Sequence, residues 1–183
     1  MLSSYFARMK PKSKSPSRKP LSKILWSGLG AFLGIYMISI FGRYFAIEES
    51  FFLLGSFGAS AVLLYGAPQA EFSQPRNLIG GHVISALVAV FLVEVCGKWL
   101  SLELVCALSV SLSIIAMHFS KTMHPPGGAT ALIYAIGSEQ ISALKWLYPF
   151  TPIGAGALIM LLVALFVNNL SRNTKRHYPT YWW

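Results

Sequence analysis

Long apolar blocks separated by short polar links dominate the pattern of this chain. Three stretches, 24–42, 50–70 and 146–171, contain no Lys, Arg, Asp or Glu. Runs of about 18 or more such residues are typical of segments that cross a membrane. The pattern therefore predicts an all-α polytopic membrane protein. Six apolar blocks can be marked, at about 24–42, 51–66, 78–94, 102–118, 127–136 and 152–170.

The order of the blocks indicates an internal repeat of long, short and long helices. In the second and fifth blocks, GASAVLL at 58–64 is similar to GATALIY at 128–134. The third and sixth blocks match more weakly, and chance similarity between helices rich in small residues is the alternative. We predict two copies, at about 24–97 and 98–171.

The short blocks decide how the two copies are related. If all three blocks of a copy cross the membrane, the odd number of crossings inverts the second copy; if the short block only dips in, the copies are parallel. The fifth block is too short to cross at about 1.5 Å per residue and needs an extended lead-in. We expect an inverted arrangement with broken short elements, which is common in transporters. Four full spans with two re-entrant pieces are the alternative.

Composition and charge support a membrane location. The chain of 183 residues is 55% hydrophobic and 11% charged, against about 45–50% and about 25% in soluble domains. Its net charge of +9 gathers at the ends. Because positive flanks stay on the cytoplasmic side and can contact anionic lipid, we predict basic cytoplasmic tails at 1–23 and 172–183 around a membrane domain at 24–171. A transit peptide over the first 20 residues is a weaker alternative, and no nucleic-acid partner is expected.

Few residues of the types that carry out catalysis occur in this chain. It contains no Asp, and its two cysteines have no neighbouring histidine. No nucleophile and base stand at a recognisable spacing. We therefore expect no enzyme activity, no metal and no cofactor.

The stretch MHPPGGATAL breaks the fifth block at its start. Pro125 and Pro126 suit the first turn of a helix, where a missing N–H is tolerated. Gly127 and Gly128 are expected to leave their backbone N–H groups uncovered. The N-terminus of a helix carries about +0.5 of a charge and free N–H donors, and it binds anions.

The first copy offers the same parts in GSFGAS, at 55–60. Ser60 corresponds to Thr130, so that each short helix has a hydroxyl in its first turns. We predict that the two helix N-termini face each other and form a small anion site. Close helix packing is the alternative role of the small residues.

Further polar side chains complete the predicted site. His124 adjoins the break and is expected to share a proton with the substrate or pair with it. A structural hydrogen bond is an equal interpretation for His82. Arg76 is the cation best placed to attract an anion, although extension to the membrane surface is an equal interpretation. The predicted substrate-binding residues are Ser56, Gly58, Ala59, Ser60, Arg76, Asn77, His82, His124, Pro125, Pro126, Gly127, Gly128, Ala129 and Thr130.

Three stretches carry a resemblance to a known family: FSQPRNLIGGH at 72–82, HPPGGATAL at 124–132 and GASAVLLYG at 58–66. Together they resemble the HPP family of integral membrane proteins, over about residues 25–170. The resemblance implies a transporter, since plant and cyanobacterial members are linked to nitrite transport in the chloroplast envelope or the bacterial membrane. It also implies four transmembrane helices.

We therefore expect a multi-pass transporter or channel for a small anion, with nitrite as the first candidate. A bacterial inner membrane is the expected location, ahead of the chloroplast envelope. A homo-oligomer is expected for a chain of this size. Nitrate, formate, a cation or a non-transporting scaffold remain alternatives.

Overall fold

Helices make up the fold in the computed structural model, which describes residues 6–10, 13–44 and 54–183. Four segments are long and apolar enough to cross a membrane. They are α2 (Leu21–Tyr44), α4 (Pro75–Phe91) with its π-helical continuation η3 (Leu92–Cys96), α5 (Leu102–Phe119), and α8 (Ala155–Leu170) with the turns η4 (Lys145–Leu147) and η5 (Pro149–Gly154) before it. The all-α, multi-pass prediction is confirmed.

Two short helices lie between the long ones. The first consists of α3 (Gly55–Ala61) and the π-helical turn η1 (Val62–Gly66), with 7 and 5 residues; the second is α6 (Pro126–Ile136), with 11 residues. At about 1.5 Å per residue each reaches less than about 20 Å, whereas the hydrocarbon core of a bilayer is about 30 Å thick. Neither helix crosses a membrane alone. Further short elements are η2 (Glu71–Ser73), α7 (Glu139–Ala143) and η6 (Thr174–Arg176).

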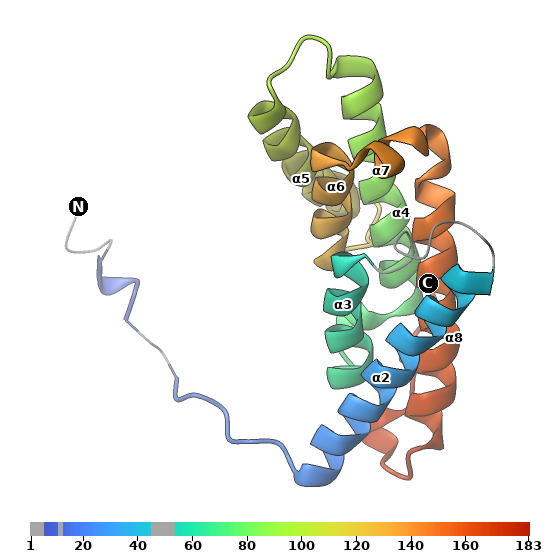
Figure 1. Cartoon of the computed structure of the whole chain (residues 1–183). Coiled ribbons are helices and arrows are strands. Elements are labelled where there is room, and N and C mark those ends of the chain that lie inside the picture. Colours follow the sequence, from blue (N-terminus) through green and yellow to red (C-terminus); the bar gives the residue numbers. More distant parts are fainter. Residues whose placement is uncertain (1–5, 11–12, 45–53) are drawn as a thin grey trace.

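The helix directions follow from Figure 1. In this view α2 and α4 ascend, whereas α5 and α8 descend. The short helix α3 begins near mid-height and descends, and α6 begins near mid-height and ascends. The first turns of the two short helices therefore lie near each other, and α3 contacts α6. The start of α2 and the end of α8 lie at the same end of the bundle (Figure 1).

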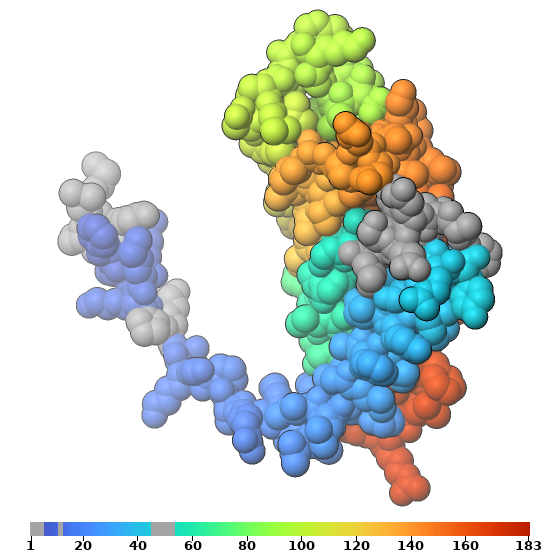
Figure 2. Space-filling model, viewed as in Figure 1, coloured from blue at the N-terminus to red at the C-terminus, as the bar shows by residue number. Residues whose placement is uncertain are grey.

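Helix α4 is the central element of the upper half, in contact with α5, α6 and η5, while α2 packs on α8 and η1. The first residue of α4, Pro75, suits the first helical position. This explains why α4 begins three residues before the apolar block predicted at 78–94. Figure 2 shows an elongated body from which residues 13–20, before α2, extend away.

Aromatic side chains fill the main core, including Phe57, Tyr65, Tyr134 and Tyr148. The hydroxyl groups of the three tyrosines make hydrogen bonds; that of Tyr65, for example, donates to the carbonyl of Met160 at 3.2 Å. The outward faces of the long helices instead carry exposed large apolar side chains. Such a surface suits lipid rather than water.

Candidate functional site

Four buried polar side chains meet beside the second turns of the two short helices. The hydroxyl oxygen of Ser60 lies 2.7 Å from Nε2 of His82 and 2.8 Å from Nε2 of His124. On the other side, Nδ1 of His82 lies 2.7 Å from the hydroxyl of Thr130. Nδ1 of His124 lies 2.6 Å from the carbonyl oxygen of Phe72. All four side chains are completely buried, and together they form one hydrogen-bonded chain, termed here the histidine relay.

The direction of the histidine relay follows from its acceptor end. The carbonyl of Phe72 can only accept, so Nδ1 of His124 carries a proton, and Nε2 of a neutral His124 accepts from Ser60. Ser60 then accepts from the Nε2–H of His82, and Nδ1 of His82 accepts from Thr130. With this assignment both imidazoles are uncharged and every donor in the relay has an acceptor.

Two carbonyl groups give the histidine relay a second arrangement. The hydroxyl of Ser60 lies 3.1 Å from the carbonyl oxygen of Ser56. The hydroxyl of Thr130 lies 3.3 Å from the carbonyl oxygen of Pro126. If a proton is added to an imidazole, its acceptor nitrogen becomes a donor. The hydroxyl of Ser60 can then donate to the carbonyl of Ser56, or the hydroxyl of Thr130 to the carbonyl of Pro126, so that no donor is left unpaired. The hydrogen-bond geometry therefore accommodates one added proton.

Close contact between α4 and the segment before α6 positions His124. Side-chain Nδ2 of Asn77 donates to the carbonyl of Met123 at 2.9 Å. A side chain at Gly81 would collide with Cβ of His124 and with the carbonyl of Thr122. The missing side chain thus allows His124 to lie against α4, within reach of Ser60.

The backbone of α6 corrects one prediction. The N–H of Gly127 donates to the carbonyl of His124 at 2.8 Å, and that of Gly128 donates to Pro125 at 3.1 Å. Pro125 and Pro126 have no N–H. The expectation that the two glycines leave their N–H groups uncovered is therefore wrong: the first turn of α6 satisfies its own donors. Imidazole and hydroxyl groups, rather than amides, are the polar groups at this junction.

Other predicted residues lie around the histidine relay rather than in it. Gly58 and Ala59 are on the exposed face of α3. Ala59, Pro125, Pro126 and Ala129 line an apolar groove of about 430 Å³ between the short helices. These residues shape the outside of the junction.

Arg76 and Asn77 contact the C-terminal segment. The guanidinium carbon of Arg76 lies 5.4 Å from the ring centre of Tyr181. The hydroxyl of Tyr181 donates to Oδ1 of Asn77 at 3.2 Å. Ser56 is buried, and its hydroxyl has no hydrogen-bond partner among the described residues. Arg76 is thus engaged by the C-terminal segment, whereas Asn77 supports the site indirectly.

Three contacts of the histidine relay have no counterpart in the predicted set. They are the carbonyl of Phe72, the ring of Phe57, centred 5.3 Å from that of His82, and the hydroxyl of Tyr148, which donates to the carbonyl of Thr130 at 3.0 Å. Phe72 lies in the FSQPRN motif, but a backbone acceptor leaves no signal in residue type. Among the described residues, no group of three or more metal-ligating side chains occurs.

Comparison with known proteins places this geometry in context. The family described as HPP, transmembrane region, matches residues 16–179. A protein of Dictyostelium discoideum named only as a transmembrane protein is 47% identical over 98% of this chain and 57% of its own length. A second one from the same organism is 46% identical over 94% of this chain and 60% of its own length. The chain thus spans somewhat over half of these relatives. No solved structure gives a match.

Proposed function

Because the chain belongs to the HPP family of transmembrane proteins, we propose that it transports a small monovalent anion together with a proton. Nitrite is the first candidate, on the resemblance of its motifs to nitrite-linked members. The observation that most supports transport is the histidine relay, since polar groups at membrane depth are costly and typically functional. Both named relatives come from Dictyostelium discoideum and lend no support to a bacterial location.

Energetics favour a proton partner for the anion. Moving a bare ion into a low-dielectric site costs of order 20 kcal/mol in an idealised estimate. One helix N-terminus returns at most about 2 kcal/mol, and the amides of Gly127 and Gly128 are already paired. An anion beside a protonated imidazole, or an anion carried as its neutral acid, avoids most of this cost. His82 and His124 are the groups that can hold that proton.

In the proposed mechanism the substrate enters at Ser60. The Ser60 hydroxyl is the central link between the two imidazoles, so turning it toward Ser56 opens the relay for an anion. The protonated imidazole then donates to the anion, while the Thr130 hydroxyl is hydrogen-bonded to the far side of the His82 ring. Passage of the proton along the relay and loss of the anion to the other side return the relay to its neutral arrangement.

An inverted repeat would provide alternating access. The opposite directions of α2 with α4 and of α5 with α8 (Figure 1) support two inverted halves, each contributing one short helix to the site. Transporters of this kind rock one half against the other around a site near the midplane. The basic residues near the start of α2 and the end of α8 support a cytoplasmic location for that end.

Nitrite uptake into vesicles containing the purified protein tests this proposal. We expect uptake above that of empty vesicles, and faster uptake when the outside is more acidic. Ser60→Ala, Thr130→Val and His124→Asn should each lower uptake by at least about tenfold, since a hydrogen bond to a charged group contributes about 1.5–3 kcal/mol and 1.4 kcal/mol is a factor of ten. Asparagine at 124 keeps a donor near the position of Nδ1 and removes Nε2.

A matched control is Ser109→Ala, because Ser109 is buried on α5 with no hydrogen-bond partner for its hydroxyl in the described part of the chain. This variant should transport as the parent does. Full uptake by Ser60→Ala and His124→Asn, from folded protein, would refute the proposed role of the histidine relay. Uptake of nitrate or formate but not nitrite would change the substrate and keep the mechanism.

A further inference from the structure

A pocket lined by basic side chains lies at the end of the bundle where α2 begins and α8 ends, away from the histidine relay. Its volume is about 370 Å³, which is within the roughly 300–1,000 Å³ range of small-ligand sites. Lys23, Arg172 and Arg176 supply three cationic side chains, and none of the described residues lining it is acidic. The pocket therefore carries a concentrated positive charge without an internal counter-ion.

Arg176 is the buried cation of this pocket, with only 2% of its surface exposed. Its guanidinium donates to Oγ of Ser27 at 3.2 Å, to the carbonyl of Tyr65 at 2.9 Å and to Oδ1 of Asn168 at 3.0 Å. These acceptors belong to α2, η1 and α8, so the side chain joins three elements. All three acceptors are neutral, and they leave the positive charge of Arg176 uncompensated.

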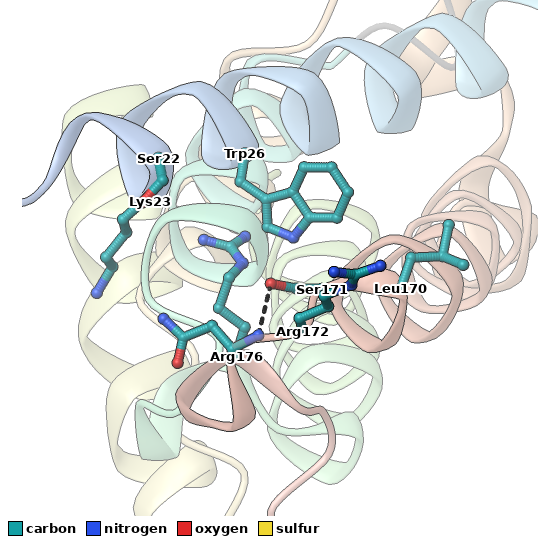
Figure 3. A pocket seen from close by; sticks show the side chains of 8 residues that line it. Ser22, Lys23, Trp26, Leu170, Ser171, Arg172 and Arg176 are labelled. Carbon is teal, nitrogen blue, oxygen red and sulfur yellow. Dashed lines mark hydrogen bonds between the residues drawn. The ribbon is translucent and has the colours of Figure 1, made fainter.

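Two further donors lack acceptors at the same place. Neither Nε of Arg176 nor the indole Nε1 of Trp26 has a hydrogen-bond partner in the described part of the chain, and both atoms are buried. Figure 3 shows the indole nitrogen of Trp26 turned toward the side chains of Ser171, Arg172 and Arg176. A buried donor without an acceptor is unfavourable, and several around one cavity point to a ligand that accepts.

We propose that this pocket binds a phosphate group, with the guanidinium groups of Arg172 and Arg176, the ammonium of Lys23 and the indole N–H of Trp26 as donors. Arginine matches the oxygen geometry of phosphate, and lysine adds a point charge. Basic pockets between membrane helices are typical binding sites of anionic lipid headgroups. The phosphate can belong to a lipid headgroup or be free in solution, and the experiment separates these sources.

Thermal unfolding of the purified, lipid-depleted full chain in detergent tests the proposal. The probes are short-chain phosphatidic acid, short-chain phosphatidylcholine as the zwitterionic control, and inorganic phosphate, each against chloride at equal ionic strength. Since a ligand that binds only the folded state raises the melting temperature, we expect phosphatidic acid to raise it. The double variant Lys23→Gln/Arg172→Gln should abolish this rise. Trp26→Phe, which keeps a ring but removes the N–H, should weaken apparent binding by about tenfold.

Lys175→Gln is the matched control, because Lys175 is an exposed cation of the same end that does not line the pocket. It should leave the rise unchanged. A rise with phosphatidic acid alone identifies a lipid headgroup, and an equal rise with inorganic phosphate shows that the phosphate group suffices. No rise with either probe, or a rise lowered as much by Lys175→Gln as by the double variant, would overturn the proposal. Nitrite uptake is a separate readout, so the two proposals can fail independently.

Discussion

Gly127 and Gly128 show how differently two adjacent glycines can be used. A Cβ at Gly127 would lie 2.7 Å from the carbonyl oxygen of Gly81 and 2.7 Å from Oγ of Ser85. A Cβ at Gly128 would meet only a methyl group of Val110, at an ordinary 3.7 Å. Only the first glycine is required for close packing of α6 on α4, and this packing holds Thr130 and His82 together.

Alanine substitution at the two glycines should therefore have opposite outcomes. We expect Gly127→Ala to lower the free energy of unfolding by about 1–3 kcal/mol, since overpacking in a dense contact costs this much. Gly128→Ala should be neutral or slightly stabilising, because alanine favours a helix over glycine by roughly 0.5–1 kcal/mol. Thermal unfolding of both variants in detergent gives the comparison. Equal loss in both would mean that the α4–α6 contact is looser than described.

At the scale of the helices, glycines also allow close packing of α2 on the first short helix. Gly30 and Gly34 lie against the ring of Tyr65 in η1. The hydroxyl of Tyr65 donates to the carbonyl of Met160 in α8, and the backbone carbonyl of Tyr65 accepts a hydrogen bond from Arg176. The π-helical turn η1 is thus held from three sides, although its helix is too short to cross a membrane. This anchoring fixes the position of Ser60, two residues before η1.

Substitutions on α2 test this anchoring. Gly34→Ala should displace the ring of Tyr65 and lower the free energy of unfolding by about 1–3 kcal/mol. Gly28→Ala is the control on the same helix, since nothing lies within 4 Å of the added atom. The measurement is the melting temperature of each variant in the same detergent. A melting temperature of Gly34→Ala equal to that of Gly28→Ala would show that Tyr65 is not a fixed contact of α2.

At the scale of the whole molecule, the direction of α4 separates the two arrangements considered from the sequence. In Figure 1, α4 runs the same way as α2, so the ends of α4 and α2 lie toward the same end of the bundle. If each half crossed the membrane only twice, α4 would run opposite to α2. The inverted repeat stays a prediction until membrane topology is measured.

Single-cysteine labelling in intact vesicles measures that topology. In a background with Cys96 and Cys106 replaced by alanine, we expect Ser22→Cys and Asn173→Cys to react with an impermeant reagent from one side. Lys98→Cys should react from the other side only. Reaction of Ser22→Cys and Lys98→Cys from the same side would instead support two parallel halves with re-entrant pieces.

The fold class could be predicted from the sequence because it depends on composition within each block. Four of the six apolar blocks correspond to the four long helices, and the Pro-Pro pair marked the start of α6 within one residue. The sequence also predicted that Ser60 and Thr130 lie near each other. It did not predict that His82 joins them, because no local sequence pattern indicates that contact. The domain boundaries and the oligomeric state stay predictions.

By itself the sequence determined a multi-pass helical membrane protein of the HPP family with two short helices. These features rest on hydrophobicity and on proline geometry, which act within a few residues. Only the tertiary structure decided that His82 and His124 share one hydroxyl, 22 and 64 residues away in the chain. It also decided that the glycine amides of α6 are paired and that Arg176 is buried. Helices that are apolar on every face leave their rotation undetermined by periodicity, so packing alone selects which side chains meet.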